Sequence, residues 1–105
     1  MAQFDVYLNP TKNNRKHYPY ILDIQSNHLS DLATRIVIPL GNASSFRNES
    51  LKGLTPEVSF EDHELLILTP QISTMLSATL SEPIGTLEHF RTEILNAIDF
   101  AISGY

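Results

Sequence analysis

The sequence predicts an α+β domain that is mainly β, with the strands first and one helix at the C-terminal end. Three observations predict this class: apolar residues alternate over residues 3–8, a β-branched run spans 34–40, and apolar residues recur every three or four positions over 87–102. The chain has 105 residues, of which 42% are hydrophobic. This length and composition fit one folded domain that spans residues 1–105.

Six segments have the character of strands. They are residues 3–8, 18–25, 34–40, 57–60, 63–69 and 77–80. We expect the 34–40 strand to be buried on both faces because of Ile36-Val37-Ile38, and to end or reach a sheet edge at Pro39, which cannot donate a ladder hydrogen bond. Glu61-Asp62 should form a two-residue hairpin turn, although the glycine that such turns prefer is missing. Residues 41–55 indicate a loop that holds one helical turn.

Residues 87–102 should form a helix that packs on the sheet. The apolar stripe consists of Leu87, Phe90, Ile94, Ile98, Ala101 and Ile102. Glu88 lies in the first turn, where the helix dipole favours an acid, and Gly104 lies where a left-handed C-cap residue is expected. Phe100 lies on the other side of the helix, so either it contacts a partner or second copy, or a loop of this chain covers it.

Charge and composition exclude several classes of function. The formal net charge is -5, with seven Lys and Arg against twelve Asp and Glu, which disfavours unaided binding to DNA or RNA. The chain has no cysteine, and this excludes disulfides, thiolate chemistry and cysteine-based zinc sites. No secretory signal and no run of about 20 apolar residues is visible, so we expect a cytoplasmic protein that does not span a membrane.

No catalytic motif is visible in the sequence. The four histidines are His17, His28, His63 and His89. No two of them have the spacing of a helical metal site, so we interpret them as surface residues. A glycine-rich phosphate loop and a nucleophile elbow are both missing. These observations predict a small binding domain without catalytic residues, metal or cofactor.

Four blocks and one glycine resemble a known family. The blocks are QFDVY at 3–7, LDIQS at 22–26, RIVIPL at 35–40 and EILNAIDF at 93–100, and the glycine is Gly104. In this order and spacing the chain resembles the CcdB toxins of bacterial toxin–antitoxin modules. The resemblance implies a five-stranded antiparallel sheet in an SH3-like barrel of the kind that CcdB shares with MazF, a small extra sheet, a C-terminal helix and a homodimer.

The resemblance also implies a function. CcdB toxins bind the A subunit of DNA gyrase and trap the gyrase–DNA cleavage complex, without making or breaking bonds themselves. A CcdA-type antitoxin binds the toxin through a disordered segment and removes it from gyrase. The toxin–antitoxin complex represses its own operon, and the toxin meets DNA only through that complex.

The resemblance assigns two sets of contact residues. The gyrase-binding set is Asp99, Ile102, Ser103, Gly104 and Tyr105, and the antitoxin-binding set is Ser26, His28, Leu29, Asp99 and Ile102. Ser103 stands where the family usually has an aromatic residue, and Tyr105 stands where it has an aliphatic one. His28-Leu29 stands where the family often has two isoleucines in its antitoxin and gyrase contact region, and Met75-Leu76 replaces a Val-Pro pair in the following loop.

Two alternative functions stay open at this point. The MazF and Kid toxins share the barrel but cleave RNA, and Arg35 with Asp23 or His28 would be the candidate acid–base residues here. Alternatively, the chain is a non-toxic CcdB homologue that only binds an antitoxin, an alternative prompted by Ser103.

Overall fold

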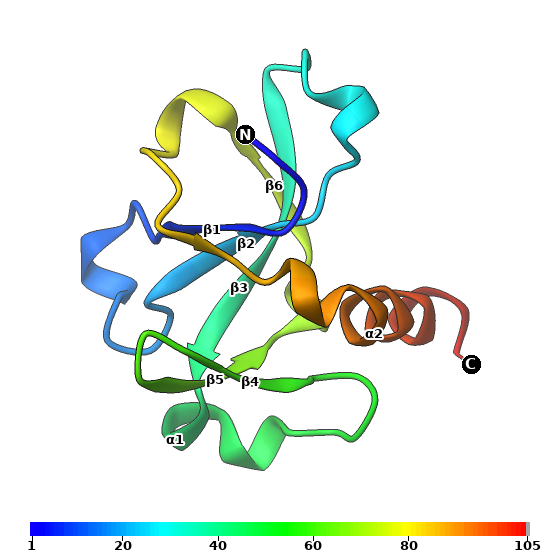
Figure 1. Ribbon diagram of the computed structural model, residues 1–105. Coiled ribbons are helices and arrows are strands. Elements are labelled where there is room, and N and C mark those ends of the chain that lie inside the picture. The colour runs from blue at the N-terminus through cyan, green and yellow to red at the C-terminus, as the bar shows by residue number, and fades with distance from the viewer. Residues whose placement is uncertain (105) are drawn as a thin grey trace.

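The computed structural model describes residues 1–104, which form a curled antiparallel sheet with one long helix packed against it (Figure 1). Seven strands lie within the described residues: β1 Asp5–Leu8, β2 Tyr20–Asp23, β3 Thr34–Asn42, β4 Glu57–Phe60, β5 His63–Ile67, β6 Ser73–Leu76 and β7 Gly85–Thr86. The strand order is β4-β5-β3-β2-β1-β7, and β6 also pairs with β3. The helices are α1 (Ala43–Phe46) and α2 (Arg91–Ser103), so the predicted mainly-β class with a C-terminal helix is confirmed.

The main core lies between the sheet and α2. Val6, Leu22 and Ile38 are neighbours across β1, β2 and β3, and all three are fully buried. Ile94 of α2 and Leu87, just before it, pack over them. Each such side chain contributes about 1.5–3 kcal/mol through burial, which explains why the helical stripe docks on this face.

The expected five strands with a separate small sheet are corrected to seven strands in one curled sheet, a half-barrel, within residues 1–104. The outer strands β4 and β7 approach each other without pairing. A Cβ atom on Gly85 of β7 would lie 2.6 Å from the Phe60 ring of β4, so only glycine allows this contact. The aromatic ring therefore fills the place where a closed barrel would have a hydrogen-bonded ladder.

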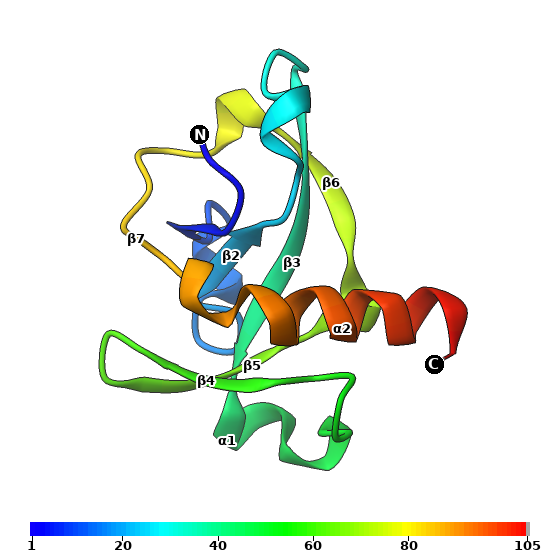
Figure 2. The same cartoon turned by 45° about the vertical axis from the view of Figure 1, so that its right-hand side comes forward.

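The length of β3 explains the single sheet. One edge of β3 pairs with β2, while the other pairs with β6 over residues 34–37 and with β5 over 40–42. Pro39 lies in the gap between these two ladders, so its missing N–H costs no hydrogen bond, and its carbonyl accepts from Leu68 N at 3.1 Å. The strand therefore continues through Pro39 to Asn42, where we had expected it to end. Figure 2 shows β6 beside the upper end of β3 and β5 beside its lower end.

Two further expectations about strands are wrong. Residues 77–79 form a 3-10 turn (η5, Ser77–Thr79), and the strand lies at β6, where Leu76 pairs with Thr34. Ile36 is 37% exposed, although Val37 and Ile38 are buried. Ile36 is the third residue of β3, and the start of this strand extends beyond α2 (Figure 2).

The predicted turns are confirmed. Glu61 and Asp62 have φ angles of 51° and 64°, the left-handed pair that a tight type I′ hairpin turn requires. One helical turn, α1, lies in the 41–55 loop. The C-terminal helix begins at Arg91 and not at residue 87 as expected, because Glu88–Phe90 form the 3-10 turn η6. Gly104 ends the helix with a φ of 77°, as predicted.

Candidate functional site

The C-terminal end of α2 projects from the body of the protein (Figures 1 and 2). Ile94 and Ala97 are buried under the first half of the helix, whereas Ile102 in its last turn is 73% exposed. Gly104 closes the helix, and its N–H donates to the Phe100 carbonyl at 2.8 Å. A Cβ atom on Gly104 would meet no other described atom within 4 Å. The helix end is therefore a rigid, accessible apolar tip.

Four of the five predicted gyrase-binding residues share this helix end. Asp99, Ile102 and Ser103 lie in the last turns of α2, and Gly104 caps them. The fifth, Tyr105, lies outside the described residues.

Phe100 on the other side of the helix is partly covered by a loop. A Cβ atom on Gly53 would lie 3.7 Å from the Phe100 ring, in ordinary van der Waals contact. The ring is still 41% exposed. The loop at Gly53 therefore covers one side of the ring and leaves the other side accessible to a partner.

The second predicted set lies on a separate tip formed by the 3-10 turn η2 (Asn27–Leu29). Ser26 caps this turn by accepting a hydrogen bond from His28 N at 3.2 Å. Leu29 is 45% exposed, and Leu32 close by is exposed as well. The turn therefore presents an apolar side chain at the protein surface.

The structure does not bring the two tips together. In Figure 1, η2 lies near the top of the molecule while the end of α2 lies lower, at the far right. Ser26, His28 and Leu29 thus form one group, and Asp99 and Ile102 belong to the other. A partner that contacts both groups must be extended, or must bridge two copies of this chain.

Asp23 and Arg35, the acid–base candidates for RNA cleavage, form a buried ion pair. Arg35 Nε and Nη2 lie 2.8 Å and 2.7 Å from Asp23 Oδ2, and both side chains are 0% exposed. Burial raises the pKa of the Asp23 carboxyl above its ordinary value, while the hydrogen bonds from Gln25 and Arg35 oppose that shift. Neither side chain can reach an RNA strand, so the structure removes this pair from the candidate catalytic residues.

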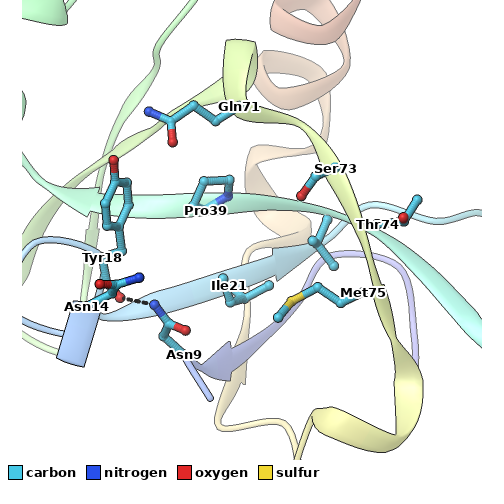
Figure 3. Close-up of a pocket in the computed structure, with 10 residues that line it drawn as sticks. Asn9, Asn14, Tyr18, Ile21, Pro39, Gln71, Ser73, Thr74 and Met75 are labelled. Carbon is cyan, nitrogen blue, oxygen red and sulfur yellow. Dashed lines mark hydrogen bonds between the residues drawn. The ribbon is translucent and has the colours of Figure 1, made fainter. Parts of the chain in front are cut away.

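A cavity of about 410 Å³ lies on the face of the sheet opposite α2, between β2, β3 and β6 (Figure 3). Its floor includes Ile21 and Pro39, and its rim includes Asn14, Tyr18 and Gln71. None of the described residues that line it carries a charge. The cavity can therefore hold an apolar group beside neutral hydrogen-bonding side chains, but it offers no general acid or base.

No group of three or more His, Asp or Glu side chains within residues 1–104 could hold a metal ion. His17 instead hydrogen-bonds Ser45 at 2.9 Å, and His63 hydrogen-bonds Tyr20 at 3.3 Å. Over the same described range, no helix is long and apolar enough to cross a membrane.

Comparison with protein families identifies the same family that the four sequence blocks resemble. A family model described as CcdB protein matches residues 3–104. The chain belongs to the CcdB family. Membership in this family indicates the toxin of a toxin–antitoxin pair, and the match includes both the η2 tip and the end of α2 up to Gly104.

Asp23 and Gln25 have a structural role that no sequence motif indicated. Both are buried in this CcdB-family protein, at 0% and 2% exposure. Together with Ile21 they lie two residues apart along the predicted 18–25 strand, so they share one face of the sheet. Polar residues at alternate positions of a buried strand are the signal that could have identified a buried polar network.

Proposed function

We propose that this protein is the toxin of a type II toxin–antitoxin pair, and that it binds the A subunit of DNA gyrase and traps the gyrase–DNA cleavage complex. It acts as a cytoplasmic homodimer, and a CcdA-type antitoxin neutralises it. The toxin–antitoxin complex represses its own operon. Family membership supports the class of protein, and the projecting helix end supports the mode of action.

The accessibility of Gly104 and its neighbours is the observation that carries the proposal. The last turn of α2 has exposed Ile102 and Ser103 side chains and ends at a glycine whose surroundings are open. A short rigid element loses little conformational entropy when it docks. A toxin that fits the open or cleaved state of gyrase better than the closed state would shift the enzyme toward the trapped state.

A homodimer suits this mode of action. A two-fold dimer presents the same helix end twice, and a two-fold target gains avidity from both contacts. The exposed apolar side chain of Leu76 on β6 offers surface that a second copy can cover, away from the helix end that contacts gyrase. Sedimentation at several protein concentrations measures this association directly.

The negative charge of the chain supports a model in which the antitoxin makes most of the DNA contacts during operon repression. With a net charge of -5, the toxin repels the DNA backbone, so the antitoxin must supply most of the phosphate contacts. The affinity of the complex for DNA should fall as the salt concentration rises, and the slope should reflect the number of phosphates that Lys and Arg side chains of the antitoxin contact. The toxin alone should not bind operator DNA.

The test uses purified gyrase and supercoiled DNA, and it measures linear DNA released from the cleavage complex. The wild-type protein should increase this product, and removal of residues 103–105 should abolish the effect without unfolding the domain. Ile84→Ala is the matched control, because Ile84 is an exposed apolar residue away from the helix end. If the truncated protein still traps gyrase, the assigned contact is wrong. A wild-type protein that binds antitoxin and leaves gyrase unaffected would be the non-toxic homologue instead.

Ser103→Trp tests the same contact by a gain of function. The resemblance implies a tryptophan at this position that stacks on an arginine of gyrase, as in the best-known member of the family, and such a cation–π contact contributes about 0.5–2 kcal/mol. Restoring it should lower the half-maximal trapping concentration about tenfold, since 1.4 kcal/mol corresponds to a factor of ten. Ser103 is exposed, so the larger side chain should leave the melting temperature unchanged. Unchanged or weaker trapping would show that this position does not face gyrase.

A further inference from the structure

A buried polar network lies directly beneath the η2 tip. Asp23, Gln25 and Arg35 are 0%, 2% and 0% exposed. The tip has no buried residue of its own within η2, and Asn27, His28 and Leu29 are all exposed. The usual anchor of a surface turn, an apolar side chain inserted into the core, is therefore missing here.

Gln25 provides the anchor through its side-chain amide. Gln25 Nε2 donates to the Leu29 carbonyl at 2.7 Å, while Gln25 Oε1 accepts from Ile36 N at 3.1 Å. One side chain thus connects the backbone of η2 to the backbone of β3. Because both ends of the amide are used, its orientation is defined.

The ion pair holds Gln25 in turn. Asp23 Oδ1 accepts from Gln25 N at 3.0 Å, and Asp23 Oδ2 accepts from Arg35 Nε at 2.8 Å. The carboxylate therefore receives one donor from the backbone of Gln25 and one from the guanidinium. Charge-assisted bonds in a buried site are strong and directional, so they hold Gln25 in the rotamer that reaches Leu29.

The other hydrogen bonds of the η2 tip are local or come from the exposed N-terminal segment at Gln3. Leu29 N donates to the Ser26 carbonyl at 3.0 Å, and Ser30 N donates to the Asn27 carbonyl at 3.3 Å. Gln3 N donates to Asn27 Oδ1 at 2.8 Å in an exposed contact. A three-residue 3-10 turn held by such bonds alone is weak.

We propose that Gln25, held by the Asp23–Arg35 pair, is a positioning residue that keeps the η2 tip in the conformation that presents His28 and Leu29 to a protein partner. This inference rests on the proposed function for the identity of that partner. The family resemblance places His28 and Leu29 in the region that contacts gyrase as well as antitoxin, so the probe is the A subunit of gyrase. A preordered tip loses less conformational entropy on binding than a mobile one. Without Gln25, the tip keeps its side chains but populates the competent conformation less often.

Hydrogen exchange tests the positioning without reference to function. Ser50 provides the reference amide, because it follows an equally short 3-10 turn, η3 (Arg47–Glu49), and its N–H donates to the Arg47 carbonyl at the same 3.3 Å. The Ser30 amide should exchange at least about ten times more slowly than the Ser50 amide. In Gln25→Met the Leu29 and Ser30 amides should lose this protection, while the amides of β4 and β5 keep theirs. Equal protection of Ser30 and Ser50 in the wild type overturns the proposal, and it does not require any variant to fold.

Gyrase trapping tests the presentation. Gln25→Met should raise the half-maximal trapping concentration about tenfold or more. Val58→Ala is the control, because it removes buried apolar volume from β4, away from the tip, and lowers stability without touching the network. Equal potency of Gln25→Met and Val58→Ala overturns the proposal. If the wild type does not trap gyrase, the proposed function fails, whereas the exchange comparison still decides whether Gln25 orders the tip.

Discussion

The Asp23–Arg35 pair allows a quantitative test of the buried network. Asp23→Asn keeps the size of the side chain and the Oδ1 acceptor for Gln25 N. It removes the negative charge and replaces Oδ2, the acceptor for Arg35, with an NH2 donor. Arg35 then stays fully buried without a counter-charge. Breaking a buried ion pair from one side costs about 3–5 kcal/mol, which is a large part of the about 5–15 kcal/mol stability of a typical domain.

Urea unfolding at one fixed protein concentration measures this cost, because association with a second copy would otherwise change the apparent stability. With an m-value of about 1.5 kcal/mol per M, a loss of about 4 kcal/mol lowers the midpoint by about 2.7 M. The double variant Asp23→Asn with Arg35→Met removes both charges. It should be more stable than Asp23→Asn alone, with a coupling energy of at least about 2 kcal/mol.

Two results would contradict this reasoning. A loss of less than about 1 kcal/mol in Asp23→Asn would place the pair in the range of solvent-exposed ion pairs. Additive effects in the double variant would show that the two side chains do not interact. Either result would mean that Arg35 reaches solvent in the folded protein.

Two further predictions concern the hairpin turn and the buried tyrosine. Glu61→Asn combined with Asp62→Gly should stabilise the protein by about 1 kcal/mol, because both positions have a positive φ that Asn and Gly adopt readily. In a thermal melt this raises Tm by about 4 °C. An unchanged or lower Tm would contradict the assigned turn type. Burial, followed by the charge of Asp5, raises the pKa of Tyr7 from 10.0 to about 12. Because the folded-state pKa is the higher one, the stabilisation is present below pH 10 and is lost as the pH rises through 12. A two-unit shift corresponds to about 3 kcal/mol, so Tyr7→Phe should show a smaller loss of stability over this range in urea titrations at each pH. An equal loss in both proteins would show that Tyr7 is not the responsible group.

Local patterns in the chain were sufficient for much of the fold. The apolar stripe predicted the packed face of the C-terminal helix as far as Ile98, because burial of one helical face depends on spacing. Its last members, Ala101 and Ile102, are exposed because the end of α2 projects from the sheet. Gly104 predicted the helix end, since few other residues adopt a positive φ without strain. The hairpin at Glu61-Asp62 followed from two flanking apolar runs even without the preferred glycine.

Long-range pairing was beyond local patterns. Pro39 ends a strand only if a neighbouring strand needs a hydrogen bond from its nitrogen. No strand needs one here, because β6 pairs with β3 up to Val37 and β5 pairs with it from Leu40. The single seven-stranded sheet within residues 1–104 follows from these two pairings. A four-residue strand such as β6 has too short an apolar pattern to be predicted from sequence, because its stability depends on pairing with β3.

The candidate site divides in the same way. The blocks of the chain were enough to assign the family and to nominate the residues of the η2 tip and the helix end. Their separation on the surface, and the burial of Asp23 and Arg35 as an ion pair, depend on the curvature of the sheet and on packing between distant segments. A charged side chain is catalytic or structural according to its access to solvent, and solvent access is a property of the assembled fold.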